Sequence, residues 1–205
     1  FALFLGACRQ PATFQKDIVD YVQLEHSLLE VSTIADSLLV PWELALYGEE
    51  KIFFTEIAGL VKQVDLRSGE VKTILNLQDQ VFHKRTTGLL GMAVQKGLGK
   101  EPYVLLNYTT KGDSAIVSNL VRYRYAADSL VDPQLLLTVK GATGHNGTRL
   151  LLNKDDMIFW ATGDAADFSQ SQDSTTLNGK ILRLALDGTV PADNPIPGSY
   201  VYAWG

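Results

Sequence analysis

One histidine and one aspartate are the residues best suited to acid–base chemistry. His145 lies between glycines in residues 143–147, and Asp164 follows nineteen residues later at the end of an apolar run. Histidine ordinarily titrates closest to neutral pH, and glycine neighbours leave its backbone open to approach. If the strands that carry the two residues are adjacent and antiparallel, Asp164 can accept a hydrogen bond from one imidazole nitrogen. The other nitrogen is then free to act as a general base.

The same residues also have a purely structural interpretation. His145 can be a turn histidine and Asp164 can cap a loop, since one such pair taken alone is weak evidence for catalysis. His83 lies in a basic loop that we expect to be solvated. The spacing of Asp164, Asp167 and Asp173 departs from that of an EF-hand loop, which argues against a calcium site there.

Composition narrows the class of protein. The 205 residues include 18 basic and 23 acidic side chains, and the net charge of −5 argues against a nucleic-acid partner, because phosphate binding needs clustered Lys and Arg. Seventeen glycines and seven prolines in a chain that is 46% hydrophobic favour many turns and argue against a helical bundle. A single cysteine cannot form an internal disulfide.

That cysteine lies in a segment typical of a secretion signal. Residues 1–8 are apolar and end in Leu5-Gly6-Ala7-Cys8, which resembles the bacterial lipobox. A stray buried cysteine is the alternative. Lipid on Cys8 would tether the protein to a membrane in the bacterial periplasm or cell envelope. Residues 9–30 would form a linker and a lead-in strand. Apolar residues 200–204 lie at the other end, and we expect the chain to be a fragment cut at both ends.

Short alternating runs recur in the same order over residues 31–205. In one run Val121, Tyr123 and Tyr125 alternate with Arg122 and Arg124, as in a strand with one face toward a core. Comparable second runs begin at residues 51, 103 and 157. Four strands that return about every fifty residues are typical of β-propeller blades, so we expect about three blades. A β-sandwich with unequal hairpins is the alternative, but it does not require a constant interval.

Several motifs carry a family resemblance. In chain order they are Val40-Pro41-Trp42-Glu43-Leu44-Ala45, Thr55-Glu56-Ile57-Ala58-Gly59, Gly88-Leu89-Leu90-Gly91-Met92-Ala93, His145-Asn146-Gly147-Thr148-Arg149-Leu150, Thr162-Gly163-Asp164 and Asn178-Gly179-Lys180-Ile181-Leu182-Arg183-Leu184. Together they resemble the glucose/sorbosone dehydrogenase family, which includes soluble quinoprotein glucose dehydrogenase and the aldose sugar dehydrogenases. The resemblance implies an all-β, six-bladed β-propeller of four-stranded antiparallel blades, about three of them in residues 31–205.

The resemblance also implies a reaction. Family enzymes bind pyrroloquinoline quinone with calcium and oxidise the C1 hydroxyl of an aldose to the lactone, passing electrons to a dye or an electron carrier. By position in the motifs, His145 matches the base and Asp164 its orienting partner. The residues implied to line the substrate or cofactor are Thr87, Gly144 and Asn146. The main quinone- and calcium-binding residues are expected beyond Gly205, with no metal ligand in this chain, and the fragment alone is expected to be inactive.

Two departures from the family pattern bear on the substrate. Glucose-oxidising members carry an aspartate before the histidine, where this chain has Gly144. Just ahead of Gly-Leu-Leu-Gly the family commonly has Gln, Glu or Gly, whereas this chain has Thr86 and Thr87. Glucose itself is therefore left open. The departures also keep an alternative, a non-catalytic β-propeller lipoprotein that binds a carbohydrate or a protein partner.

Overall fold

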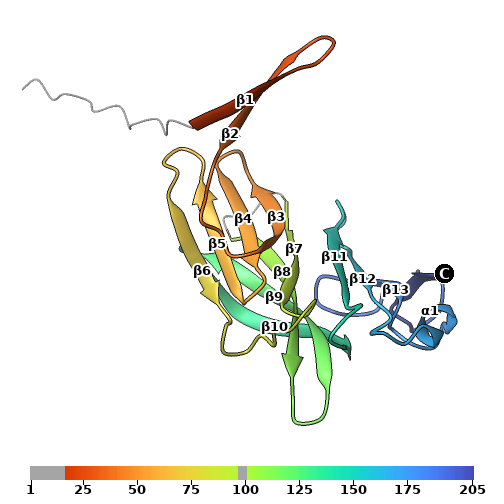
Figure 1. Ribbon diagram of the computed structural model, residues 1–205. Coiled ribbons are helices and arrows are strands. Elements are labelled where there is room, and N and C mark those ends of the chain that lie inside the picture. The colour runs from red at the N-terminus through yellow and green to blue at the C-terminus, as the bar shows by residue number, and fades with distance from the viewer. Residues whose placement is uncertain (1–16, 97–100) are drawn as a thin grey trace, which may run out of the picture.

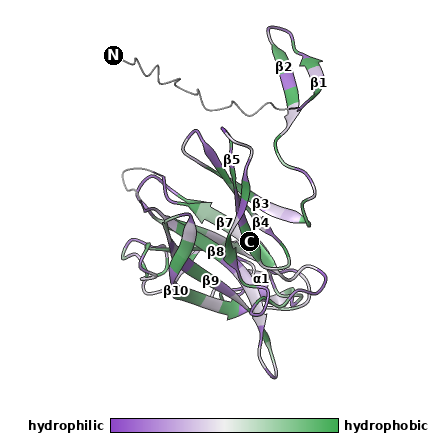
Figure 2. Ribbon diagram, turned by 90° about the vertical axis from the view of Figure 1, so that its left-hand side faces the viewer, coloured by the Kyte–Doolittle hydropathy of each residue, from purple (hydrophilic) through white to green (hydrophobic). Residues whose placement is uncertain are grey.

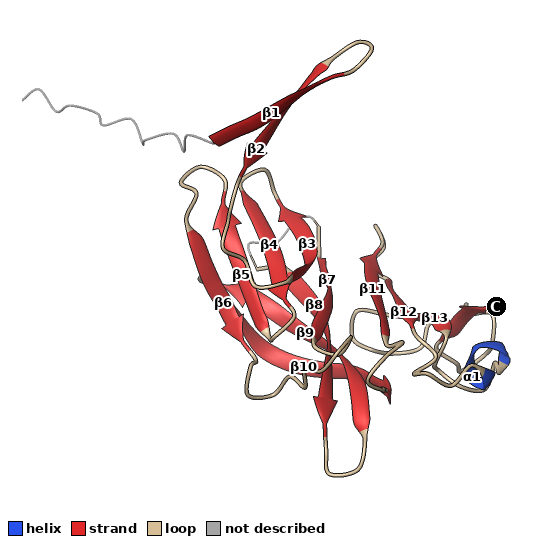
Figure 3. Ribbon diagram, in the orientation of Figure 1, coloured by secondary structure: helices blue, strands red, loops and turns tan. Residues whose placement is uncertain are grey.

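The computed structural model describes residues 17–96 and 101–205, which form three four-stranded antiparallel sheets and a separate hairpin (Figures 1 and 3). Cys8 lies outside the described residues. Each four-stranded sheet pairs its strands in chain order. The strands are β3 (Pro41–Tyr47), β4 (Lys51–Glu56), β5 (Leu60–Asp65) and β6 (Val71–Asn76); β7 (Leu89–Val94), β8 (Tyr103–Lys111), β9 (Ile116–Ala126) and β10 (Ser129–Lys140); and β11 (Gly147–Leu152), β12 (Ile158–Thr162), β13 (Lys180–Leu184) and β14 (Val201–Trp204).

This arrangement confirms the predicted repeat. The fold is all-β, and its three sheets are consecutive blades of a partial six-bladed β-propeller. The second sheet lies between the other two, with one buried cluster on each of its sides, so the sandwich alternative is wrong. Short turns join most neighbouring strands of the first two blades, whereas the third has two longer connections, residues 163–179, which carry the only helix of the described residues, and residues 185–200.

A hairpin precedes the sheets. It consists of β1 (Asp17–Gln23) and β2 (Leu28–Thr33), which pair with each other and stand apart from the first blade in Figure 1. Most of its apolar side chains, Tyr21 and Leu28 among them, are exposed. The only helix of the described residues, α1 (Ser169–Gln172), is four residues long. The described part of the chain has no helix that is long and apolar enough to cross a membrane.

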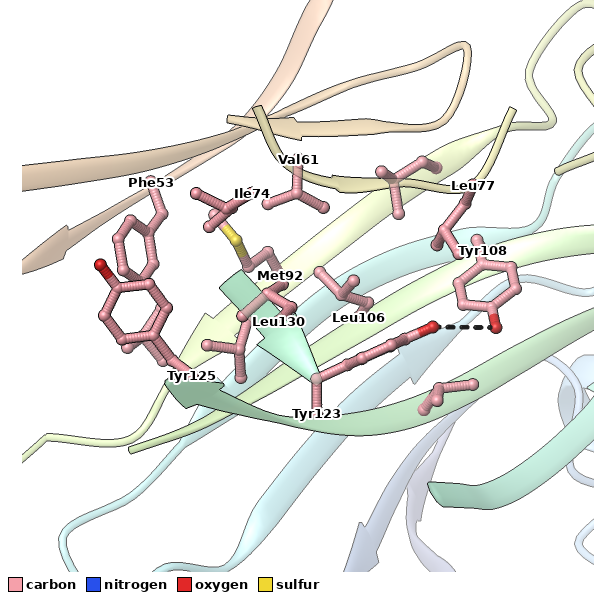
Figure 4. Close-up of a cluster of buried hydrophobic side chains, with 14 residues drawn as sticks. Phe53, Val61, Ile74, Leu77, Met92, Leu106, Tyr108, Tyr123, Tyr125 and Leu130 are labelled. Atoms are coloured by element: carbon pink, nitrogen blue, oxygen red, sulfur yellow. Dashed lines mark hydrogen bonds between the residues drawn. The ribbon is translucent and has the colours of Figure 1, made fainter. Parts of the chain in front are cut away.

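The alternating pattern of β9 sorts its side chains as predicted. Val121, Tyr123 and Tyr125 are buried, and they pack with Phe53 of β4 and Met92 of β7 in the cluster between the first two blades (Figure 4). On the other side of the second blade, a second cluster joins it to the third. Figure 2 shows the strands β7 and β8 as largely hydrophobic, which is expected for a sheet covered on both faces.

The first strands of the three blades lie side by side. β7 contacts β3 and β4 on one side and β11 on the other. At Gly91 in β7 a Cβ atom would lie 1.9 Å from the carbonyl oxygen of Thr148, so only glycine allows this approach. The loops that precede β7 and β11 are consequently brought together at one end of the stacked blades.

A polar cluster fastens the first blade to the second. Lys51 Nζ donates hydrogen bonds to Asp128 Oδ1 (2.6 Å) and to the Tyr125 hydroxyl (2.9 Å), which itself lies 2.7 Å from Gln63 Oε1. The hydrogen bond from Lys51, followed by that from Tyr125, holds the pKa of Asp128 below its usual range. The ionised carboxylate therefore stabilises the folded state.

Replacing Asp128 with Asn should lower stability at pH 7 by less than about 1 kcal/mol, because the carboxylate is partly exposed and screened. A depressed folded pKa contributes stability above the unfolded pKa of about 4 and loses it as the pH falls further. The difference in unfolding free energy between wild type and Asp128→Asn, measured by denaturant titration, should shrink below about pH 4. A gap that widens on acidification would contradict this assignment.

Candidate functional site

The loop that enters β11 and the loop that leaves β12 meet at one point. Gly147 of β11 pairs with Thr162 of β12, so the residues just outside the ladder, His145 and Asp164, come side by side. Imidazole Nδ1 of His145 lies 3.0 Å from Asp164 Oδ1. The backbone N–H of Ala165 also donates to the His145 carbonyl at 3.0 Å. The contact expected from the spacing is therefore present.

Two glycines permit this meeting. A Cβ at Gly163 would lie 1.9 Å from the His145 carbonyl oxygen, and one at Gly147 would lie 2.3 Å from the Gly163 nitrogen. Gly147 also has φ +71°, a conformation in which other residues are strained. Both positions therefore need glycine if the two loops are to pass this closely.

The contact between His145 and Asp164 decides which imidazole nitrogen carries the proton. Asp164 Oδ1 also accepts a hydrogen bond from the Ala166 N–H at 2.9 Å, which fixes the carboxylate as an acceptor. His145 Nδ1 is then the proton-bearing nitrogen, so Nε2 carries the free lone pair. The side chain of Asp164 is 14% exposed and that of His145 is 55% exposed. The result is an oriented imidazole on a half-exposed side chain.

A cavity of about 350 Å³ opens beside His145, within the range of small-molecule sites. Its lining residues come from the loops before β7 and β11 and the loop after β12; they are Arg85, Thr86, Thr143, Gly144, His145 and Ala166. The loops from the two blades are joined, because Thr86 Oγ1 donates to the Thr143 carbonyl at 3.3 Å. Gly144, one of the residues predicted to line the substrate or cofactor, borders this cavity.

Two of the residues predicted to line the substrate or cofactor, Thr87 and Asn146, do not border this cavity. Thr87 is fully buried, and its hydroxyl bonds the backbone of Lys84, accepting from N–H at 2.6 Å and donating to the carbonyl at 2.8 Å. The preceding Thr86 lines the cavity instead, because adjacent residues of the turn point in different directions. Asn146 is also buried. Its amide bonds both backbone groups of Ala142, so it shapes the loop and does not line the cavity.

A buried lysine supports the site, and its role was missed. Lys180 is 3% exposed, and its Nζ donates to the carbonyl oxygens of Ser171 (3.1 Å) and Asn178 (2.6 Å), with a further bond to that of Gln170. Burial lowers its pKa. These bonds hold α1 and the chain beside it against the end of β13. The position of Lys180 in a family-like motif was the available signal, but the motif did not show what the side chain would touch.

Carboxylates in the same loop serve the loop itself. Asp167 bonds Ser169, and Asp173 bonds Thr175, each through the following backbone N–H and the hydroxyl. Across residues 17–96 and 101–205 no group of three metal-ligating side chains gathers. The acidic side chains of this loop therefore stabilise its turns and do not converge on one point.

A larger open cavity of about 600 Å³ lies over the exposed face of the first blade. Its lining is mainly apolar and includes Trp42, Phe54 and Leu44, with Glu43 as its ionisable side chain. The carboxylate of Glu43 is paired with Arg149. The smaller cavity beside His145 is therefore the candidate functional site.

Comparisons with known proteins point to one family. Residues 38–205 match the family described as Glucose / Sorbosone dehydrogenase. The quinoprotein glucose dehydrogenase B of Acinetobacter calcoaceticus is 30% identical over 192 residues, which cover 79% of this chain and 40% of that protein. The aldose sugar dehydrogenase YliI of Escherichia coli (strain K12) is 27% identical over 174 residues, covering 82% of this chain and 47% of that protein.

A solved structure extends the match to the fold. The pyrroloquinoline quinone-bound form of aldose sugar dehydrogenase from Streptomyces coelicolor superposes with a TM-score of 0.76 at 25% identity. The alignment covers 96% of this chain and 56% of that one. The chain thus spans about half the length of the relatives that it matches.

Replacing Gly163 with Ala should separate the two loops, because the new methyl would overlap the His145 carbonyl oxygen. We expect loss of the hydrogen-bonded Nδ1–H resonance of His145 in proton NMR and a lower unfolding free energy by about 1–3 kcal/mol. Gly112→Ala is the matched control, since no atom lies within 4 Å of a Cβ there. An intact imidazole signal in Gly163→Ala would show that the close approach is not required.

Proposed function

Because the chain belongs to the glucose/sorbosone dehydrogenase family, we propose that the whole protein oxidises the C1 hydroxyl of an aldose to the lactone, with His145 as general base and pyrroloquinoline quinone as the hydride acceptor. The observation that carries the proposal is the oriented, half-exposed imidazole at the cavity, held by Asp164 at 3.0 Å. The family relation alone would allow a propeller without this pair.

The residues of this chain supply the proton-transfer half of the reaction. With Nδ1 occupied by Asp164, Nε2 of His145 takes the proton of the C1 hydroxyl as the C1–H bond breaks. Asp164 is buried enough to keep its orientation and to stabilise the imidazolium that forms. The hydride leaves C1 with its electron pair, the C1–O bond becomes a carbonyl, and the ring product is a lactone.

Aromatic surface lies beside the candidate base. The rings of His145 and Phe168 lie 5.8 Å apart, and Phe168 is 77% exposed, so flat apolar surface borders the accessible base. A planar quinone would stack on the exposed ring of Phe168, beside His145. When bound, the quinone supplies a two-electron acceptor for the hydride. The described residues gather no group of three His, Cys, Asp or Glu side chains that would hold calcium.

We further propose that the protein acts in the bacterial periplasm or cell envelope, tethered by lipid on Cys8, and that a soluble electron carrier or dye reoxidises it. The support is the sequence Leu5-Gly6-Ala7-Cys8. Metabolic labelling with a radioactive fatty acid should mark the wild-type protein and not Cys8→Ser. Equal labelling of the two would remove the tether from the proposal.

The activity is tested by reconstituting the whole protein with pyrroloquinoline quinone and calcium and following dye reduction with a panel of aldoses. We expect sugar-dependent reduction that needs the quinone. Confirmed quinone binding without turnover of any aldose would contradict the proposal and favour the non-catalytic binding module.

Removing the base should lower turnover. His145→Ala is expected to reduce kcat by about 10²–10⁴-fold in the same assay, because the hydroxyl proton loses its acceptor. Unchanged kcat in this variant, with the fold intact by circular dichroism, would reject the role of His145.

Asp164→Asn should also be slow, for a different reason. The amide can present N–H to Nδ1 and favour the tautomer whose Nε2 is protonated, so kcat should fall by about 10²–10⁴-fold while the Ala166 turn is kept. The exposed Asp155→Asn, remote from the cavity, serves as the control. If both variants retain full activity, Asp164 does not orient the base.

A further inference from the structure

Arg85 is a cation at the cavity without a protein partner. It lines the same cavity as His145, and its side chain is exposed. Among the described residues its guanidinium forms no hydrogen bond or ion pair. Arg122, Arg124, Arg149 and Arg183, in contrast, are all paired with carboxylate, amide or carbonyl oxygens. An unpaired guanidinium in a small-molecule cavity is available to a ligand.

The backbone that carries Arg85 is held in a defined turn. Its φ of +61° is in the left-handed region, which is strained for a residue with a side chain. The turn is held by its neighbours, because the Thr87 hydroxyl bonds the backbone of Lys84 and His83 Nδ1 lies 2.7 Å from the Thr87 carbonyl. Thr86 adds a bond to the neighbouring blade. The base of the Arg85 side chain is therefore fixed at the cavity.

No carboxylate lines the cavity to neutralise this charge. Asp164 is the nearest acidic residue to the base, and its Oδ1 is used by His145 Nδ1 and the Ala166 N–H. The side chains that line the cavity are otherwise hydroxyls, a methyl group and the imidazole. A cavity with one positive charge and no negative one attracts anions.

We propose that Arg85 selects an aldose that carries an anionic group, a carboxylate or a phosphate, at a carbon away from C1. The planar guanidinium pairs with either group through two parallel N–H···O bonds. His145 would meet the C1 hydroxyl while Arg85 holds the anionic group at the other end. This inference rests on the proposed function, since His145 acts on the same sugar.

Gly144 offers a way to reverse the selection. A Cβ at this position would meet only Thr86 Oγ1, at 3.8 Å, and Gly144 has no left-handed backbone, so a side chain fits there without strain. Gly144→Asp would add a carboxylate to the cavity. This variant should weaken the binding of anionic sugars by at least about tenfold relative to that of neutral sugars, because the new carboxylate would repel the anionic group.

The test compares D-glucuronate, D-glucose 6-phosphate and D-glucose. Rates are measured with the whole protein loaded with pyrroloquinoline quinone, and binding of the same sugars is measured by calorimetry on the quinone-free protein. We expect kcat/KM for at least one anionic sugar to exceed that for glucose by about tenfold or more, with the difference mostly in KM. Which of the two is preferred distinguishes a carboxylate from a phosphate.

Arg85→Gln should remove this preference. Arg85→Lys should keep part of it, because lysine keeps the positive charge but lacks the two parallel N–H donors of the guanidinium. The matched control is Lys84→Gln. It removes the same charge one residue away, but Lys84 does not line the cavity. We expect it to change the preference by less than about twofold.

The outcomes separate the two proposals. Turnover of neutral aldoses with no anionic preference, or equal effects of the Arg85 and Lys84 variants, overturns the role of Arg85 and leaves the proposed function standing. Arg85-dependent binding of an anionic sugar without any turnover supports the role of Arg85 and rejects the proposed function. If Arg85→Gln weakens only quinone binding, Arg85 belongs to the cofactor and the inference is wrong. Absence of both binding and turnover overturns both proposals.

Discussion

The candidate site depends on how closely two backbone segments pass at the open end of the third blade. Gly147 and Gly163 face each other there, and a side chain at either would overlap the other segment. Their approach carries His145 and Asp164, which lie just outside the β11–β12 ladder, to 3.0 Å from each other. A hydrogen bond between two loop residues would be weak if it had to order both loops by itself, because ordering costs conformational entropy. Here the ladder and the glycines bear that cost, so the imidazole is oriented before a ligand arrives.

Stacking of the blades supplies the rest of the cavity. The close contact of Gly91 with the Thr148 carbonyl holds β7 against β11, and buried side chains on both faces of the second blade prevent the sheets from sliding. Arg85 and Thr86 belong to the second blade, whereas His145 belongs to the third. Residues that are sixty positions apart in the chain therefore line one cavity. Propellers commonly vary their chemistry in this way, through loops on a rigid scaffold.

Much of the fold could be predicted from the sequence. Period-two alternation at Val121, Tyr123 and Tyr125 matched the buried face of β9, and the return of strand types about every fifty residues matched the three blades. Local patterns succeed here because each strand buries one face in a way that its own residues express. The hairpin β1–β2 was harder to see, because its apolar side chains are largely exposed and burial does not explain its pattern. α1 was also unexpected, since four residues are too few for a helical period to show.

Residue types and spacing were sufficient to indicate the blades, the family-like motifs and the pairing of His145 with Asp164, because antiparallel neighbours in one sheet have a geometry that follows from their separation in the chain. They were not sufficient for the lining of the cavity. Thr86 and Thr87 are adjacent and chemically identical. Because the Thr87 hydroxyl bonds the backbone of Lys84, the turn places Thr87 in the interior and Thr86 at the cavity. The same holds for two other side chains. Asn146 is placed by hydrogen bonds to Ala142 within its own loop, and Lys180 by bonds to the preceding loop at Ser171 and Asn178. Arg85 reaches the cavity from a turn that contacts the neighbouring blade. Which way a loop side chain points depends on the hydrogen bonds of its turn and on packing between blades, and neither is expressed in the alternation of residue types along the chain.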